Sequence, residues 1–287
     1  MGVYEEVVQS TAEALIQAST TFRTDQIEAY HRAIALEKNV HAKWILGKII
    51  SNAEIAKEQR VPLCDDTGVP HVLIEVGDKA EIPKGFFQAI DGGIKKGLRE
   101  LPGRPMAVCG DDLSRISQSC GLFEDSGALT MAPPQIKRLP GDKITLTVLM
   151  LGGGPEIRGK TLPVFHQHSY DVVIKEMISW GTESSMLLGC QPCILAYGIG
   201  RTHLEAASLC LEAMAKGDLS KQSKTEKLIK DEINKEGIGP LGMGGSCTVL
   251  GVFVNIGPQR ASGVRIISLR AGCCFDPRRA TVTFCFN

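Results

Sequence analysis

Ten cysteines in a chain of 287 residues constrain this sequence more than any other feature, because each must be a disulfide partner, a ligand, a catalytic group or a core thiol. The first twenty residues carry Glu5, Glu6 and Glu13 among scattered apolar positions, unlike a secretion signal or a membrane span. We therefore expect a cytoplasmic protein without a membrane anchor, in which reducing conditions disfavour disulfides. Because cysteine is among the most frequently buried residues, five are expected to be core thiols: Cys109, Cys120, Cys210, Cys247 and Cys285.

The charge balance excludes one broad class of partner. The chain has 32 basic and 32 acidic residues and a formal net charge of +0, so no excess charge attracts it to phosphate backbones or anionic lipid. We expect neither nucleic-acid nor membrane binding. Hydrophobic residues make up 43% of the chain, which is enough for a substantial core.

The periodicity of apolar residues indicates an α+β fold. Helical spacing over residues 4–59 gives way to strand-like runs and glycine-rich loops from residue 61 onward. Because no internal repeat or clear linker is present, we expect one domain over residues 1–287, with a helical region over 1–60 and mixed β-sheets flanked by helices over 61–287. Strands are expected at 71–76, 143–151, 194–200, 264–269 and 280–286, and helices at 172–188 and from a capping box at Thr202 and Glu205 to about Ala215.

A phosphate-binding loop is the main alternative interpretation. The run Gly154-Pro-Glu-Ile-Arg-Gly159-Lys160-Thr161 matches the pattern G-x-x-x-x-G-K-T and follows an expected strand. In a P-loop nucleotide-binding protein, however, this loop feeds directly into a helix, and Pro163 stands two residues past Thr161. No clear apolar strand ending in Asp is present to bind magnesium. Nucleotide binding is therefore disfavoured.

Two shorter motifs also have structural explanations. Cys190-Gln-Pro-Cys193 is a C-x-x-C pair, as in redox dithiols and zinc sites, but it runs into an expected strand rather than a helix. The adjacent pair Cys273-Cys274 is poorly spaced to complete a zinc site. Gly198-Ile-Gly200 begins like a dinucleotide fingerprint, but His203 replaces the third glycine, which favours a tight strand-to-helix turn.

Taken in order, five segments resemble one enzyme family. They are Cys64-Asp65-Asp66-Thr67-Gly68, Gly152-Gly-Gly154, Cys190-Gln-Pro with Tyr197-Gly-Ile-Gly200, Gly237-Ile-Gly-Pro-Leu-Gly-Met-Gly-Gly245, and Cys274 followed by Arg278-Arg279. Their order and spacing, over about residues 40–285, resemble the class I fumarases and tartrate dehydratases, specifically the α subunit of two-subunit members. The resemblance implies an iron–sulfur hydro-lyase that adds water to, or removes it from, a C4 dicarboxylate such as fumarate or tartrate.

The resemblance also implies roles for individual residues. In the family three thiolates hold one [4Fe–4S] cluster, which leaves one iron open as a Lewis acid. The implied ligands are Cys64, Cys190 and Cys274, with Cys273 left open as an alternative to Cys274. Asp66 is the implied acid/base catalyst, and the alternative is that its carboxylate only caps its own loop. The implied substrate-binding residues are Asp65, Thr67, Arg104, Gly152, Gly153, Gly154, Arg260 and Arg278.

Several departures from the family pattern leave the substrate open. Asp65 replaces a glutamine, and a histidine expected about a dozen residues before the last cysteine is absent, with Arg260 in the corresponding segment. Gln191-Pro192 replaces a pair of prolines, and Arg201 replaces a glycine. Leu151 stands where many fumarases have lysine, which makes this run more similar to tartrate dehydratases.

The resemblance finally implies a partner. Single-chain fumarases of this family have a C-terminal domain that supplies further catalytic groups, and nothing in the 287 residues resembles it. We therefore expect a separate β subunit and an α2β2 heterotetramer. A non-enzymatic alternative is an iron–sulfur or redox-sensing protein on the same scaffold, which would keep the cluster but show no turnover.

Overall fold

The computed structural model describes residues 2–286 and divides the chain into two compact units. The first unit contains the described residues up to Thr21, then Glu54–Leu151, then the described residues from Arg278 onward. The second unit contains Phe22–Ala53 and Gly152–Pro277. Each unit is therefore assembled from segments that are far apart in the sequence.

The first unit is built on a four-stranded mixed sheet in the order β2-β1-β3-β8. β1 and β2 are parallel, whereas β1 with β3 and β3 with β8 are antiparallel. β3 is an inner strand, and its almost continuous apolar run is buried along nearly its whole length, as expected for a strand covered on both faces. The strands are β1 (Val69–Gly77), β2 (Gln135–Leu139), β3 (Ile144–Leu151) and β8 (Arg278–Phe284).

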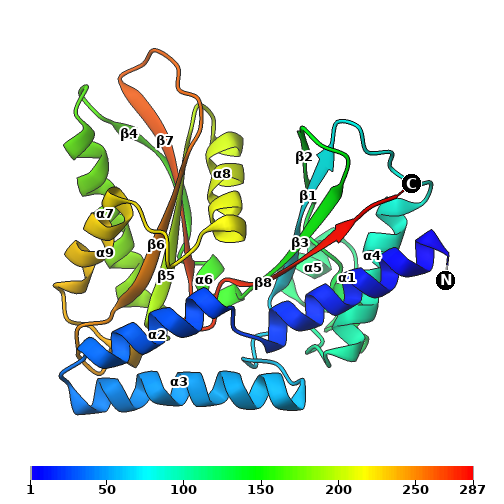
Figure 1. Ribbon diagram of the computed structural model, residues 1–287, viewed down its shortest axis with the longest axis horizontal. Helices are drawn as coiled ribbons and strands as arrows, with labels where there is room; N and C mark the ends of the chain where they lie inside the picture. Colours follow the sequence, from blue (N-terminus) through cyan, green and yellow to red (C-terminus); the bar gives the residue numbers. More distant parts are fainter. Residues whose placement is uncertain (1, 287) are drawn as a thin grey trace. The chain divides into compact units, whose positions relative to one another are not determined.

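Helices α1 (Val3–Thr20) and α4 (Phe86–Glu100) pack against each other beside this sheet (Figure 1). A Cβ on Gly93 of α4 would lie 2.6 Å from the Cβ of Thr11, so glycine permits the close approach of the two helices. Two short helices, α5 (Asp112–Ser117) and η1 (Ser126–Leu129), lie between α4 and β2 in the sequence. The core between helices and sheet includes Leu15, Phe86, Ile90, Ile94, Ile74, Leu146 and Val148.

The second unit is built on another four-stranded mixed sheet, in the order β4-β7-β5-β6. β5 and β6 are parallel, and β7 is antiparallel to both β5 and β4. All eight residues of β5 are buried. The strands are β4 (Lys160–Phe165), β5 (Cys193–Gly200), β6 (Val249–Ile256) and β7 (Val264–Gly272).

Helices cover both faces of this sheet (Figure 1). α8 (His203–Lys216) packs on one face, and α7 (Tyr170–Leu188) with α9 (Lys224–Asn234) packs on the other. Met177 of α7 and Ile233 of α9 share one core with Leu195 and Tyr197 of β5. The remaining helices are α2 (Thr24–Leu36), α3 (Val40–Gln59), which continues from residues of the second unit into the first, α6 (Gly153–Glu156) and η2 (Pro240–Gly242).

The expected α+β class with mixed sheets and a helical N-terminal region agrees with this structure, and every expected strand and helix is present. Within residues 2–286, no helix combines the length and apolar character needed to cross a bilayer. The burial of Cys210 and Cys247 is confirmed. The same expectation is wrong for Cys120 and Cys285, which are exposed, and for Cys109, which is half-buried. These three lie outside the strands and helices that form the cores, on loop segments.

Candidate functional site

The segment Cys64–Gly68 forms a short loop in the first unit between α3 and β1. Asp66 Oδ1 accepts a hydrogen bond from the backbone N–H of Gly68, at 3.2 Å, so this carboxylate does cap its own loop. Gly68 has a φ of 83°, and a Cβ there would lie 2.8 Å from Arg278 and 2.9 Å from the Leu151 carbonyl. Glycine is therefore required at this turn, both for its left-handed backbone and for space.

The buried side chain of Arg278 anchors the backbone of this loop. Its side chain is only 2% exposed, and Nη1 donates to the carbonyl oxygens of Asp66 at 2.7 Å and Thr67 at 3.2 Å. Thr67 is also buried, and its Oγ1 accepts a hydrogen bond from the backbone N–H of Arg104 at 2.8 Å. The first residue of β8 therefore fixes the backbone that carries Asp66, and Thr67 joins the loop to the Arg104 segment.

The exposed side of the same loop carries charge. Asp65 Oδ2 lies 3.7 Å from Arg104 Nη1, and the two side chains are 89% and 56% exposed. An ion pair this exposed contributes little to stability, and both groups are accessible from solvent. The half-buried Cys64 thiol donates to Asp65 Oδ1 at 3.4 Å. The structure thus brings Cys64, Asp65, Asp66 and Arg104 of the predicted site together within one unit.

Two other predicted ligands meet in the second unit. Cys190 lies in the turn between α7 and β5, and Cys274 follows the end of β7. The backbone N–H of Cys274 donates to the carbonyl oxygen of Cys190 at 3.0 Å, so the two segments are hydrogen-bonded neighbours. A hydrogen bond from Cys273 and burial both raise the pKa of the Cys274 thiol, and repulsion from Cys190 adds to this effect. Three thiols are therefore gathered at one end of the sheet.

Helix α2 secures the turn that carries Cys274. Tyr30, which is fully buried, donates through its hydroxyl to the Cys274 carbonyl, and Gln26 Nε2 donates to the carbonyl oxygens of Phe275 and Asp276, each at 3.1 Å. Arg23 Nη1 donates to the carbonyl of Pro277 at 2.6 Å. This clamp was not predicted from the sequence, because its acceptors are all backbone carbonyl oxygens.

Cys193, the alternative to Cys190, is a core residue. It is 0% exposed, its sulfur lies 3.1 Å from Ser185 Oγ, and burial raises its pKa to about 12. The half-buried Cys190 is the more accessible member of the C-x-x-C pair.

The glycine run follows β3 directly, and Arg260 lies in a loop of the second unit. Gly152 is buried at the end of β3, and Gly153 and Gly154 are exposed at the start of α6. Arg260 is exposed in the loop before β7, whereas Cys274 follows β7. A nine-residue strand spans about 30 Å, so the structure does not bring Arg260 to the cysteines of this unit. Substrate binding by Arg260 and the glycines stays a prediction.

The phosphate-loop alternative is not favoured by the geometry. Lys160 and Thr161 begin strand β4, whereas a phosphate-binding loop leads into a helix whose N-terminus faces the phosphates. Lys160 is also engaged by Glu183, and its ammonium lies 5.7 Å from the centre of a Trp180 ring.

The candidate ligands are divided between the two units, with Cys64 in the first and Cys190 and Cys274 in the second. All ten cysteines, which lie within the described residues, are thiols rather than disulfides. Among residues 2–286, no group of three or more His, Cys, Asp or Glu side chains is arranged to hold a metal ion.

Comparison with known proteins identifies the family. Residues 8–283 match the model of the family described as fumarate hydratase (Fumerase). Because the match covers almost the whole chain, the protein belongs to this family of hydro-lyases.

Curated relatives are similar along nearly their full length. The putative L(+)-tartrate dehydratase subunit alpha of Methanocaldococcus jannaschii is 28% identical over 284 residues, which cover 96% of this chain and 94% of the relative. The L(+)-tartrate dehydratase subunit alpha of Escherichia coli strain K12 is 21% identical over 282 residues, covering 96% of this chain and 90% of the relative. The counterpart from E. coli strain UTI89 is 22% identical over the same length.

Proposed function

We propose that this chain is the α subunit of a hydro-lyase that adds water to, or removes it from, a C4 dicarboxylate, with fumarate/malate and tartrate/oxaloacetate as the leading substrate pairs. The observation that carries this proposal is family membership over residues 8–283. Similarity to relatives that are named subunit alpha supports a separate β subunit, which we propose forms an α2β2 heterotetramer with this chain. We place the complex in the cytoplasm, where ten cysteines persist as thiols.

The proposed cofactor is a [4Fe–4S] cluster with Cys64, Cys190 and Cys274 as its ligands. The chemistry of the donors fits, because thiolates are the usual ligands of such clusters. The hydrogen bond between the Cys190 and Cys274 segments supports their assignment as a pair. When bound through only three thiolates, the cluster supplies a Lewis-acidic iron for the hydroxyl and carboxylate of the substrate.

The protein groups then have separate tasks. Elimination of water from a 2-hydroxy acid requires a proton for the departing hydroxide, and we assign this donor role to Asp66. The hydrogen bond from Gly68 and the anchoring of the backbone by Arg278 hold the Asp66 carboxylate in one orientation. Arg104 presents a guanidinium of the shape that grips a carboxylate in a bidentate manner. Asp65 and Thr67, with the backbone N–H groups of Gly152–Gly154, complete the proposed substrate contacts. Arg260 and Arg278 stay candidates.

The test is cluster content in matched cysteine variants. The chain is purified anaerobically with its β subunit, and iron and acid-labile sulfide are measured per polypeptide together with the EPR spectrum. We expect about four irons in the wild type and loss of most iron in Cys64→Ser, Cys190→Ser and Cys274→Ser. The control variants Cys193→Ser and Cys273→Ser should retain the cluster.

Each outcome has a distinct meaning. Zinc in place of iron would contradict the cofactor, and loss of iron in Cys273→Ser with retention in Cys274→Ser would exchange those two ligands. A full cluster without turnover of malate or either tartrate enantiomer, in the presence of the β subunit, would support the non-enzymatic alternative. Asp66→Asn should keep the cluster and lose turnover by a factor of about 100 or more.

A further inference from the structure

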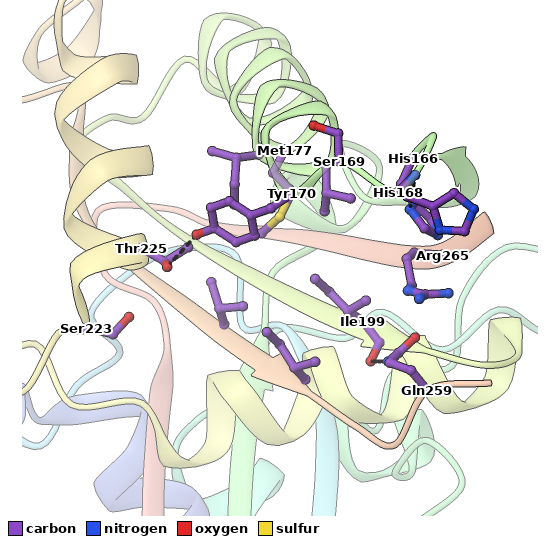
Figure 2. Close-up of a pocket in the computed structure, with 14 residues that line it drawn as sticks. His166, His168, Ser169, Tyr170, Met177, Ile199, Ser223, Thr225, Gln259 and Arg265 are labelled. Carbon is purple, nitrogen blue, oxygen red and sulfur yellow. Dashed lines mark hydrogen bonds between the residues drawn. The ribbon is translucent and has the colours of Figure 1, made fainter. Parts of the chain in front are cut away.

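The second unit contains a cavity whose lining includes none of the residues proposed to bind the substrate or the cluster. It has a volume of about 490 Å³ and lies between α7, α9 and the strands β5, β6 and β7 (Figure 2). This volume falls within the range of small-molecule binding sites. Its central wall is aliphatic and is formed by Val173, Ile174, Met177, Ile199, Val254 and Ile256.

Polar groups lie at the two ends of this apolar wall. Figure 2 shows His166, His168 and Arg265 at one end, with Gln259 close by, and Tyr170 with Thr225 and Ser223 at the other. The Tyr170 hydroxyl lies 2.7 Å from Thr225 Oγ1, so one hydroxyl donates to the other and this end of the cavity is polar but uncharged. The end that contains Arg265 differs because it carries a charge.

Arg265 is a cation that has no carboxylate partner among the described residues. Its Nη1 donates to the carbonyl oxygens of Ser262 at 3.1 Å and Val264 at 3.0 Å, which fix the guanidinium in place. None of the 14 residues that line the cavity is Asp or Glu, although the whole chain has as many acidic as basic residues. The charge of the cavity is therefore one-sided, and an anion would complement it.

The backbone turn beside Arg265 is held in one unusual conformation. Gln167 and His168 both have left-handed φ values, 47° and 56°, which non-glycine residues rarely adopt. The buried His166 stabilises this turn, because its Nδ1 accepts a hydrogen bond from the His168 N–H at 3.0 Å. Its Nε2 lies 2.9 Å from the carbonyl oxygen of Ser262 and donates to it in the tautomer that this network requires. The turn presents the His168 ring at the same end of the cavity as Arg265 (Figure 2).

We propose that this cavity binds a small amphiphilic monocarboxylate, with its carboxylate at Arg265 and its aliphatic chain along the wall from Ile199 to Met177. A dicarboxylate fits less well, because its second charge would be placed on apolar side chains or beside hydroxyl groups that carry no positive charge. The inference does not rest on the hydro-lyase activity, and the predicted ligand differs from the proposed substrates.

The test is titration of the purified full-length chain with butanoate, hexanoate and octanoate by calorimetry. Burial of each added methylene should tighten binding by about fourfold, up to the length that fills the cavity. Octanol, which lacks the charge, should bind at least about tenfold more weakly than octanoate. In protein labelled at the methionine methyl groups, octanoate should shift the NMR signal of Met177, which lines the cavity, and leave that of Met214 unchanged.

Matched variants test whether Arg265 binds the carboxylate of the ligand. Arg265→Gln should weaken octanoate binding by about tenfold or more, whereas the control Arg201→Gln removes an arginine that is already paired with Glu205 and should have no effect. If Arg265→Gln fails to fold, Ile256→Glu provides the same test, because Ile256 is 59% exposed and a carboxylate there would repel the ligand.

Five results would overturn the proposal. Four of them are equal binding of octanol and octanoate, equal losses in Arg265→Gln and Arg201→Gln, a Met177 shift caused by malate or tartrate but not by octanoate, and no saturable binding by a folded chain. A solution dimer that Ile256→Glu dissociates would also overturn it, because a second copy of the chain would then be the occupant.

Discussion

Replacing Gly198 with alanine should destabilise the second unit, because β5 and α8 touch backbone to backbone at this residue. A Cβ on Gly198 would lie 2.1 Å from the carbonyl oxygen of Ala206 and 2.3 Å from the backbone nitrogen of Cys210. Ordinary contacts of a Cβ begin near 3.4 Å. The helix would therefore have to move by about 1 Å in a close-packed interior that tolerates little displacement.

The size of the effect follows from two contributions. Overpacking of a core typically costs about 1–3 kcal/mol. Movement of α8 also weakens the buried hydrogen bond from Cys210 Sγ to the Ala196 carbonyl, now 3.1 Å long, a contribution of about 0.5–1.5 kcal/mol. We expect a total loss of about 2–4 kcal/mol in the free energy of unfolding, which lowers the melting temperature of a domain of this size by about 4–16 °C.

The assay is thermal unfolding followed by circular dichroism, with Gly47→Ala as the matched control. Gly47 lies inside α3 in the same unit, and a Cβ there would meet no atom within 4 Å. Alanine should stabilise this helix by about 0.5–1 kcal/mol. A Gly198→Ala protein that melts within about 2 °C of the wild type would refute the claim that glycine is needed for helix–strand contact.

Two further predictions concern single interactions. Arg278→Met removes the donor to the carbonyl oxygens of Asp66 and Thr67. Hydrogen exchange of the backbone amides in residues 64–68 should therefore accelerate by about tenfold or more, while exchange in β3 is unaffected. Unchanged exchange in residues 64–68 would contradict the anchoring role. Hydrogen bonds from the Ser220 hydroxyl and amide lower the pKa of Asp218 to about 2. Ionised Asp218 therefore stabilises the fold above its unfolded pKa of about 3.9. This stabilisation is lost as the pH falls toward 2. Because this side chain is partly exposed, we expect a contribution of about 1 kcal/mol to the free energy of unfolding. In urea unfolding, the difference in stability between the wild type and Asp218→Asn should shrink by that amount between pH 5 and pH 2. A difference that stays constant would contradict the assignment.

The sequence predicted elements well where periodicity was undisturbed. β3 and β5 are long apolar runs bounded by glycine, and both appear close to their expected ends. Helix α4 was not predicted, although its buried residues recur every three or four positions. The Thr202 cap is present, but Glu205 bonds to the backbone N–H of Arg201 instead of completing the capping box. The contacts of Glu205 with Arg201 therefore replace the second hydrogen bond of the capping box.

The site shows the same limit. The family resemblance named Cys190 and Cys274 as ligands, an assignment that stays a prediction, and the structure places them on hydrogen-bonded neighbouring segments. The sequence pattern has a clear limit. It could not show that Arg278 is buried beneath the loop of Asp66, because burial of a charged side chain depends on what the tertiary structure packs around it. Nor could it reveal the clamp of Gln26 and Tyr30, whose partners are backbone carbonyls and carry no residue-specific signature.

That clamp also sets the order of events when the chain is made. Tyr30 and Cys274 are separated by 244 residues, and Gln26 and Asp276 by 250. At a synthesis rate of about 5–20 residues per second, α2 leaves the ribosome roughly 10–50 s before the turn that it will hold exists. The Cys190 and Cys274 segments therefore cannot become neighbours until the turn after β7 has been synthesised. A nascent or truncated chain that stops short of this turn exposes Cys190 without its neighbour.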